Sequence, residues 1–403
     1  MKLIGLGGLS VAIAIGMSAC IAASSTPPAA TQRVSANSIL PSASMAPATP
    51  TAIPATPTAS PTAARSLASV PPGGRFSPTG PMAVPRWLAV AVTLLDGRVL
   101  IVGGTGPNGG ALASAEIYDP ESGLFNASGS MSVARQQPTA TVLQDGRVLI
   151  VGGVQGFDVL ASAELYDPKT GTFSPTGSMA TQRVEQSATL LGDGRVLIAG
   201  GTDEVKSFAS AEIYSPVTGT FSSAGSMAHD GSYVATLLRD GRVLLIDGTD
   251  HATLYDPKTG AFRSAGQGSK VTMKHAGTAT VLDDGSVLVT PASGVCADNK
   301  AALYDPAKDL FSQTGPMVTA RQGATATLLP SGRLLLAGGS ACDRSTVLAS
   351  AELYDPRTGK FGQAASMTTA RTNQTATLLQ NGQVLIAGGG PADGTFTAEL
   401  YQP

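Results

Sequence analysis

The stretch that decides the fold is residues 135–179, RQQPTATVLQDGRVLIVGGVQGFDVLASAELYDPKTGTFSPTGSM. It contains four short strand-like segments, at residues 139–143, 147–151, 161–166 and 172–176. Asp145-Gly146 separates the first two and predicts a tight hairpin, because both positions tolerate positive φ. Pro175 suits an outer edge strand, since proline cannot donate to a ladder. We therefore predict a four-stranded antiparallel sheet whose two apolar faces must stack against other sheets.

The same pattern recurs along the chain and supplies those other sheets. The hairpin glycine returns at intervals of 44 to 50 residues, at Gly97, Gly146, Gly194, Gly241, Gly285, Gly332 and Gly382. The tyrosine of the third strand also has seven copies, at Tyr118, Tyr166, Tyr214, Tyr255, Tyr304, Tyr354 and Tyr401. A period near 50 residues, with four strands and a Gly-Gly doublet, is typical of a β-propeller blade.

These motifs together resemble the kelch repeat, whose fold is shared with galactose oxidase. The matching doublets are Gly103-Gly104, Gly152-Gly153, Gly200-Gly201, Gly338-Gly339 and Gly388-Gly389, and the resemblance covers residues 73–403. Kelch repeats usually carry Trp where this chain has Phe, at Phe125, Phe173, Phe221, Phe262, Phe311 and Phe361. The expected fold is all-β: a seven-bladed β-propeller of four-stranded antiparallel blades.

The ring is expected to close through a strand from the N-terminal side. The seventh repeat stops at Tyr401-Gln402-Pro403, before any fourth strand, whereas residues 75–82, RFSPTGPM, match residues 172–179. We therefore predict that residues 76–80 form the outer strand of the blade that begins at Thr375. This arrangement removes an open sheet edge.

Two segments precede the expected propeller. Residues 1–20, MKLIGLGGLSVAIAIGMSAC, form a signal-peptide pattern that ends in Met-Ser-Ala-Cys. That ending resembles a bacterial lipobox, which implies lipidation of Cys20 and an exported protein anchored at the bacterial cell envelope. An ordinary secretory signal cut near Ala19, or an uncleaved anchor, is the alternative. Residues 21–72 are rich in Ala, Pro, Ser and Thr, so we expect a disordered linker.

Composition excludes several classes of partner. The formal net charge is −2 and charged residues make up 13% of the chain. No basic stripe interleaved with aromatic residues is present, which argues against nucleic acid. The glycine doublets do not precede helices, so they are not a dinucleotide fingerprint, and no Walker-type loop occurs. We expect a monomeric head, attached to a membrane only by the lipid, whose ligand is a protein or a glycan.

A repeated arginine and a repeated glutamate occur in the same five blades. The arginine lies eleven residues before the hairpin glycine, and the glutamate two residues before the tyrosine: Arg86 and Glu116, Arg135 and Glu164, Arg183 and Glu212, Arg321 and Glu352, Arg371 and Glu399. The fourth and fifth blades lack both. We interpret this joint loss as five structural ion pairs within blades. The alternative is a basic ring near the channel mouth, where the kelch resemblance places the arginines.

The remaining cysteines, Cys296 and Cys342, follow the second strands of the fifth and sixth blades. Because these loops open on the same face of neighbouring blades in an exported protein, a disulfide is expected. Two free thiols too far apart to bridge are the alternative.

Three classes of function fit this sequence. The first is a non-enzymatic binding module or interaction scaffold on the cell surface, favoured by regular repeats and the anchor. The second is an oxidase of the galactose-oxidase kind, whose copper site uses two tyrosines, two histidines and a cysteine cross-linked to one tyrosine. Seven of the eight tyrosines here are repeat tyrosines and no Tyr-His pair exists, so we expect no copper cofactor. The third is a carbohydrate-binding or carbohydrate-acting propeller, in which Trp87 could stack on a sugar unless it is buried in its blade.

The three histidines gather at the fourth and fifth blades. His229, His251 and His275 lie in connections that emerge on one face, near Asp230, Asp250 and Lys274. We consider these six residues a candidate ligand site, and imidazole with carboxylate is a donor set for a divalent metal. The alternative is that these blades have drifted and the histidines are surface residues. The absence of a spacing such as His-x-x-x-His favours this alternative.

Overall fold

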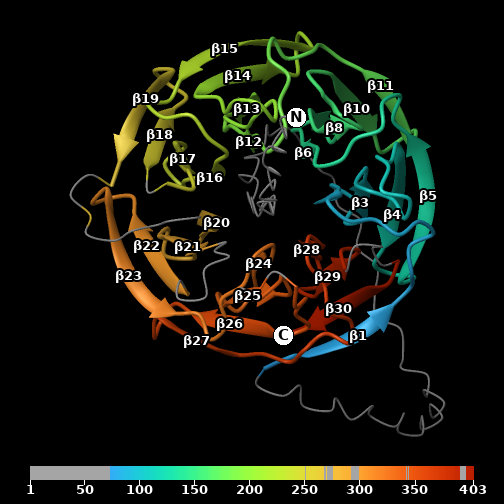
Figure 1. Cartoon of the computed structure of the whole chain (residues 1–403), viewed down its shortest axis with the longest axis vertical. Coiled ribbons are helices and arrows are strands. Elements are labelled where there is room, and N and C mark those ends of the chain that lie inside the picture. Colours follow the sequence, from blue (N-terminus) through green and yellow to red (C-terminus); the bar gives the residue numbers. More distant parts are fainter. Residues whose placement is uncertain are drawn as a thin grey trace, which may run out of the picture. The chain divides into compact units, whose positions relative to one another are not determined.

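The computed structural model describes residues 73–249, 251–266, 269, 276–291, 299–341, 343, 345–390 and 396–403. Seven four-stranded antiparallel sheets are arranged around a central axis (Figure 1). This confirms the predicted seven-bladed β-propeller. The described residues contain no α-helix, so none of their segments is a helix that could span a membrane.

The first three blades run from the innermost to the outermost strand in chain order. Blade 1 comprises β2 (Val90–Thr93), β3 (Val99–Val102), β4 (Ser114–Asp119) and β5 (Leu124–Ser130). Blade 2 comprises β6 (Thr139–Val142), β7 (Val148–Val151), β10 (Ala163–Asp167) and β11 (Thr172–Pro175). Blade 3 comprises β12 (Ser187–Leu190), β13 (Val196–Ala199), β14 (Ser210–Ser215) and β15 (Thr220–Ser226).

Blades 4 to 6 repeat this order. Blade 4 comprises β16 (Val234–Leu237), β17 (Val243–Ile246), β18 (Ala252–Asp256) and β19 (Ala261–Ala265). Blade 5 comprises β20 (Ala276–Val281), β21 (Val287–Pro291), β22 (Lys300–Asp305) and β23 (Leu310–Pro316). Blade 6 comprises β24 (Thr325–Leu328), β25 (Leu334–Ala337), β26 (Ala351–Asp355) and β27 (Lys360–Gln363).

Blade 7 joins the two ends of the propeller in one sheet. Its strands are β28 (Thr375–Leu378), β29 (Val384–Ala387), β30 (Ala398–Gln402) and, outermost, β1 (Arg75–Thr79). The β1–β30 register runs from Arg75 opposite Gln402 to Thr79 opposite Ala398. The Arg75 guanidinium donates to Gln402 Oε1 at 2.7 and 2.9 Å. The predicted closure by the N-terminal strand is confirmed.

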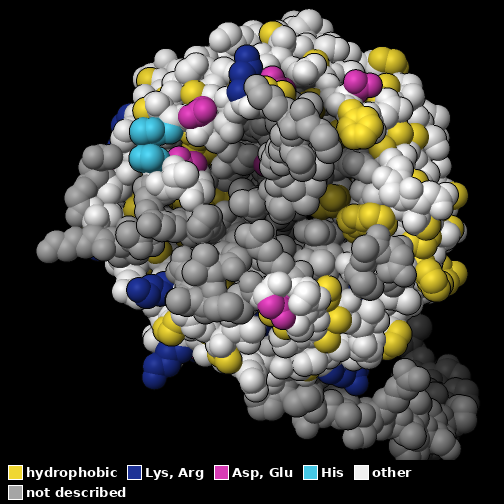
Figure 2. Space-filling model, in the orientation of Figure 1, with side chains coloured by type: hydrophobic (Ala, Val, Ile, Leu, Met, Phe, Trp, Pro, Cys, Tyr) yellow, Lys and Arg dark blue, Asp and Glu magenta, His cyan; other side chains and the backbone are white. Residues whose placement is uncertain are grey.

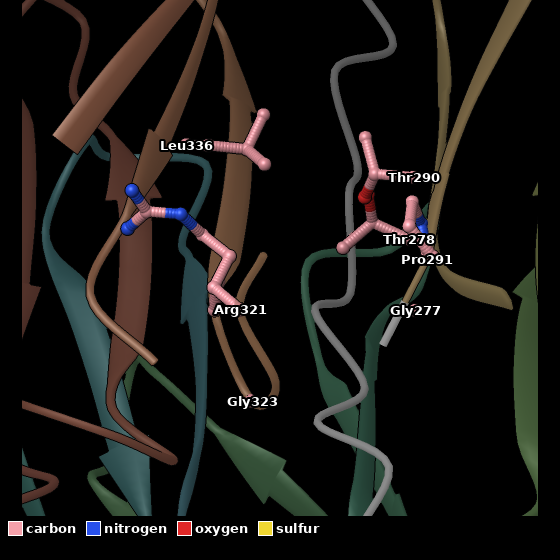
Figure 3. Close-up of a pocket in the computed structure, with 8 residues that line it drawn as sticks. Gly277, Thr278, Thr290, Pro291, Arg321, Gly323 and Leu336 are labelled. Carbon is pink, nitrogen blue, oxygen red and sulfur yellow. The ribbon is translucent and has the colours of Figure 1, made fainter. Parts of the chain in front are cut away.

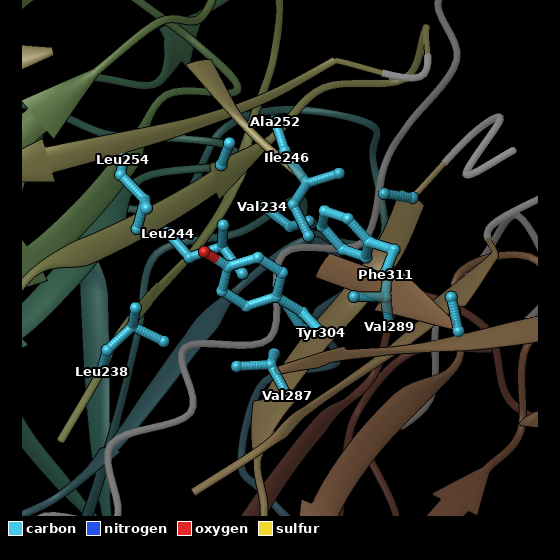
Figure 4. Close-up of a cluster of buried hydrophobic side chains, with 14 residues drawn as sticks. Val234, Leu238, Leu244, Ile246, Ala252, Leu254, Val287, Val289, Tyr304 and Phe311 are labelled. Carbon is cyan, nitrogen blue, oxygen red and sulfur yellow. The ribbon is translucent and has the colours of Figure 1, made fainter. Parts of the chain in front are cut away.

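Apolar side chains fill the space between neighbouring blades. The second strand of each blade is buried on both faces, as its β-branched and leucine-rich sequence predicts. Figure 4 shows one such core, where Leu244 and Ile246 of blade 4 pack against Val289 and Tyr304 of blade 5. Each such side chain contributes about 1.5–3 kcal/mol on burial. Sheets that are apolar on both faces are thus stable only as members of the ring.

The repeat tyrosines attach each blade to the preceding one. All seven are buried, and each ring packs on an outer-strand phenylalanine of its own blade at centroid distances of 4.7 to 4.9 Å. Four of them also hydrogen-bond a Thr or Ser hydroxyl of the preceding blade, as Tyr166 does with Ser128 at 2.8 Å. The tyrosines therefore stabilise the fold.

The glycine doublets lie where consecutive blades meet. Gly152 has a φ of +65°, and a Cβ there would lie 2.6 Å from the carbonyl oxygen of Arg183 in the next blade. The following residue, Gly153, donates its N–H to that same oxygen at 3.0 Å. Gly389 makes the equivalent bond to Arg86 at 3.0 Å and so links blade 7 to blade 1. The doublet is needed because the next blade's backbone passes too close for a side chain.

Candidate functional site

The connections of the propeller divide between two faces. Because the strands of each blade are antiparallel, inter-blade connections and the loops between second and third strands emerge at the same end, which we call the loop face. The Asp-Gly hairpins and the turns before the outer strands form the opposite end, the turn face. The three residues of the predicted ligand site that the structure describes, His229, Asp230 and His251, belong to the loop-face connections.

The repeated arginines and glutamates meet within their own blades. The shortest N–O distances are 2.7 to 3.2 Å in the pairs Arg86–Glu116, Arg135–Glu164, Arg183–Glu212, Arg321–Glu352 and Arg371–Glu399. These ten residues are no more than 4% exposed. In blade 2, Arg135 Nη1 also donates to the carbonyl oxygens of Gly152 and Ser162. The guanidinium thus attaches the connection entering the blade to the loop after its second strand.

The buried arginines offer little to a ligand. Desolvation lowers the pKa of Arg86, Arg135, Arg183 and Arg371, opposed by the paired glutamates. Arginine nevertheless stays protonated in proteins. The guanidinium Nε of each repeat arginine is buried without a hydrogen-bond partner among the described residues. The other nitrogens are bound to glutamate, carbonyl and hydroxyl groups of the same blade, so no basic ring faces the channel mouth.

Blade 4 replaces this pair with a different polar group. Asp230 occupies the arginine position and is exposed, whereas Asp247 replaces the first doublet glycine and is 2% exposed. Asp247 Oδ1 accepts from the backbone N–H groups of Thr249 and His251 at 2.8 and 2.9 Å. Its Oδ2 lies 3.1 Å from His251 Nδ1. The buried carboxylate therefore shapes the loop that carries His251.

Two of the three predicted histidines are brought into direct contact. The rings of His229 and His251 stack with centroids 3.6 Å apart and an interplanar angle of 11°. Figure 2 shows the two described imidazoles side by side on the loop face. Tyr233 is buried beside them and donates its hydroxyl to the carbonyl oxygen of His229. Burial, together with the negative charges of Asp247 and Asp230, raises the pKa of Tyr233.

The stack is a poor chelate for one metal ion. An imidazole nitrogen directs its lone pair within the ring plane, at about 2.0–2.1 Å from a bound zinc. Two nearly parallel planes 3.6 Å apart share no point that satisfies both rings. Within the described part of the chain, no group of three His, Cys, Asp or Glu could hold a metal ion. Asp250, Lys274 and His275 of the predicted site lie outside the described residues, as do Cys20, Cys296 and Cys342.

Two exposed apolar side chains on the loop face were not found from the sequence. Phe157 is 98% exposed at the tip of a small hairpin formed by β8 (Val154–Gln155) and β9 (Asp158–Val159). Val205 is 93% exposed in the equivalent loop of blade 3. The sequence feature that could have indicated this site is a phenylalanine next to Gly156, in the segment between the doublet Gly152-Gly153 and the third strand of blade 2. Trp87, expected to be buried unless it stacks on a ligand, is half-buried in the connection that enters blade 1.

A small pocket opens between blades 5 and 6. Its lining includes Thr278, Thr290 and Pro291 of blade 5, and Arg321 and Leu336 of blade 6. The two threonine hydroxyls bond each other at 2.7 Å, and Figure 3 shows the Arg321 guanidinium turned away from them. Proline here replaces the first doublet glycine. We interpret the pocket as a packing gap between two unequal blades.

Comparisons with known proteins support this architecture. A model of the Kelch motif matches residues 86–132, 138–180 and 186–228, which correspond to blades 1 to 3. The fold is similar to that of a solved structure described as a novel fungal alcohol oxidase with catalytic diversity among the AA5 family, in complex with copper. The TM-score is 0.68 at 19% identity, over 82% of this chain and 76% of that one. A search of curated proteins finds no match.

The residues described here do not fit the copper site that the galactose-oxidase resemblance implies. That site needs two tyrosines and two histidines around one ion. The seven repeat tyrosines are buried against phenylalanines, and Tyr233 is buried with its hydroxyl on a backbone carbonyl. The two described histidines stack on each other. The likeness to the oxidase therefore shows the fold alone.

Proposed function

We propose that the protein is a non-catalytic binding module whose loop face holds a protein partner. The observation that carries this proposal is the near-complete exposure of Phe157 and Val205 on the loops of two neighbouring blades, each of which is held by its own internal hydrogen bonds. Large apolar side chains kept in water on neighbouring loops are characteristic of interaction sites. The repeated Arg, Glu, Gly and Tyr residues, in contrast, serve the packing of the ring. Function on loops above a rigid scaffold agrees with this division.

The proposal can be tested by site-specific photocrosslinking in cells that produce the full chain. A photoreactive phenylalanine analogue at position 157 should give an adduct of defined mass with a second protein. The same analogue at position 217, where Val217 is 96% exposed on the turn face, should give none. Equal labelling from both positions, or no adduct at 157, would contradict a partner on the loop face. Peroxide release from alcohols by the copper-loaded protein would contradict the non-catalytic role.

The proposal includes display at the bacterial cell envelope through a lipid on Cys20. The lipobox-like ending at Cys20 and the linker-like composition of residues 21–72 support it. We expect cells fed an alkyne fatty acid to label the wild-type chain and not the Cys20→Ala variant. Labelling that survives this substitution would contradict the anchor.

Carbohydrate binding is the second candidate. Half-exposed Trp87, next to buried Arg86 on the loop face, supports it because an accessible indole stacks on sugar rings. A glycan array probed with the wild type and with Trp87→Ala would test it. Binding that is lost in Trp87→Ala favours this candidate, whereas an array without signal contradicts it.

A further inference from the structure

We infer that the loop tips of blades 2 and 3 form one docking surface for a polypeptide segment that carries apolar side chains flanked by Lys or Arg. This inference rests on the proposed function and names the chemistry of the partner. We call the surface the blade 2–3 patch, and define it by Phe157, Asp158, Glu185, Glu204 and Val205. Four features of these loops support it.

The two loops form a continuous structure through Val184. The Val184 side chain packs with Val154 and Val159 at the base of the blade 2 hairpin. Its backbone exchanges two hydrogen bonds of 2.9 Å with Thr202 in the blade 3 loop. Each loop therefore fixes the position of the other. Phe157 and Val205 therefore lie at the tips of two loops that both contact Val184.

The tips of both loops are ordered without a bound partner. In the hairpin, Gln155 pairs with Asp158 directly beside Phe157. In blade 3, Asp203 Oδ1 accepts from the N–H groups of Val205 and Lys206 at 3.1 and 2.8 Å. These bonds hold both apolar side chains in water. Binding then needs little further ordering, which is how preorganised surfaces gain affinity.

The charged side chains around the two loop tips are mostly acidic. Asp158 and Glu204 are exposed, and Asp203 is half-buried in its turn. Lys206, the cation of the same loop, lies over the Phe208 ring at 5.5 Å. Acidic side chains therefore outnumber basic ones on this part of the loop face. A partner with Lys or Arg beside its apolar residues is complementary to such a surface.

Glu185 lies in the connection that enters blade 3, beside the connection that enters blade 4. Its carboxylate accepts from Ser232 Oγ at 2.9 Å. Burial and the nearby charge of Glu204 raise the pKa of Glu185. A cationic side chain bound here would compensate a carboxylate that the fold leaves poorly solvated.

The test is selection of random linear peptides on the immobilised full-length protein. We expect the enriched peptides to combine aromatic or aliphatic residues with Lys or Arg. Their affinity should fall about tenfold or more in Phe157→Ser, the loss expected for a central apolar contact. It should fall less in Val205→Ser. The matched control is Val217→Ser, which removes an equally exposed valine from the turn face and should leave the affinity unchanged.

Charge is tested separately. Glu204→Gln should weaken peptide binding. Raising the ionic strength from about 0.1 M to about 1 M, which shortens the Debye length from about 10 Å to about 3 Å, should reduce the affinity of the wild type more than that of this variant. Each substituted residue is exposed, so melting temperatures should stay at the wild-type value and exclude unfolding as the cause.

Several outcomes would overturn the inference. They are enriched peptides without basic residues, equal binding to Phe157→Ser, no enrichment at all, or self-association of the chain that Phe157→Ser abolishes. If one of these results is obtained but position 157 still crosslinks to a second protein in cells, the protein is still a binding module. Only the proposed apolar and basic character of its partner is then refuted. No adduct and no enrichment would remove both.

Discussion

Arg135 and Glu164 form an ion pair that fixes the connection entering blade 2, and both charged groups have almost no contact with water. Arg135 is 0% exposed and Glu164 is 2% exposed. The carboxylate also accepts from the backbone N–H groups of Ser132 and Val133, at 2.8 and 3.2 Å. Burying two ions is costly, so the pair adds little net stability over an apolar pair. The pair instead restricts the connection to one conformation, because any conformation that separated the two groups would leave a buried charge without a counter-charge.

We predict that Arg135→Ala lowers the free energy of unfolding by about 3–5 kcal/mol, because it leaves Glu164 buried without a counter-charge. In a Glu164→Ala background the same substitution should cost much less. Chemical denaturation of the four proteins in this double-mutant cycle gives the coupling energy. Simple additivity of the two substitutions would count against the pair.

Glu185 provides a prediction of pH dependence. Its pKa is raised by burial, so the folded state binds the proton more tightly than the unfolded state does. Stability from this group is therefore greatest at low pH and falls as pH rises above the unfolded value of about 4.3. Glu185→Gln should melt like the wild type near pH 4 and at a higher temperature than the wild type near neutrality. Melting curves that differ by the same amount at every pH would contradict this.

At the level of elements, the glycine doublets determine how closely two blades approach. Gly152 and Gly156 share a φ of +65°, but they differ in surroundings. A Cβ at Gly152 would lie 2.5 Å from the Gln186 side chain and 2.6 Å from the Arg183 carbonyl oxygen, whereas a Cβ at Gly156 would meet nothing within 4 Å. The two positions thus separate the cost of backbone conformation from the cost of inter-blade contact.

We predict that Gly156→Ala destabilises the protein by about 1–2 kcal/mol, the cost of the left-handed conformation alone. Gly152→Ala should cost distinctly more, because a backbone carbonyl must also move. Urea denaturation of both variants measures the difference. Equal losses of stability in the two variants would show that Gly152 is needed only for its backbone conformation and not for the close approach of the next blade.

The strands and their order could be predicted because each repeat contains its own hairpin and turn signals. The Asp145-Gly146 hairpin and the match between residues 75–82 and 172–179 needed no knowledge of distant contacts. The β8–β9 hairpin could not be predicted, since two-residue strands carry no periodicity. The stacking of His229 and His251 also depends on how Asp247 folds its loop, which spacing along the chain does not encode.

At the level of the whole molecule, β1 determines whether the ring is closed. It contributes Phe76, whose ring packs on Tyr401 at 4.9 Å, to the core shared with blade 6. The N–H of Gly80 also donates to the carbonyl oxygen of Gly123 in blade 1 at 3.0 Å. Strand β1 therefore joins blade 7 to both of its neighbours.

We predict that deletion of residues 73–82 lowers the melting temperature sharply. The deletion exposes the edge of β30 and uncovers Tyr401, which are both covered in the intact chain. Differential scanning calorimetry of the deleted and intact chains measures the effect. An unchanged melting temperature would mean that the ring does not depend on this strand.

The antiparallel register of β1 and β30 also makes the closure sensitive to the direction of a mechanical load. Arg75 lies opposite Gln402, so tension between these two residues separates the strands one hydrogen-bonded pair at a time. Tension between Arg75 and Ala398 loads the same pairs together, because these residues lie at opposite ends of the ladder. Optical-tweezers handles at the first two positions should thus open the ring at a lower force than handles at the second two. A load that enters the ring at Arg75 and is resisted at Gln402 would therefore open blade 7 by peeling rather than by shear.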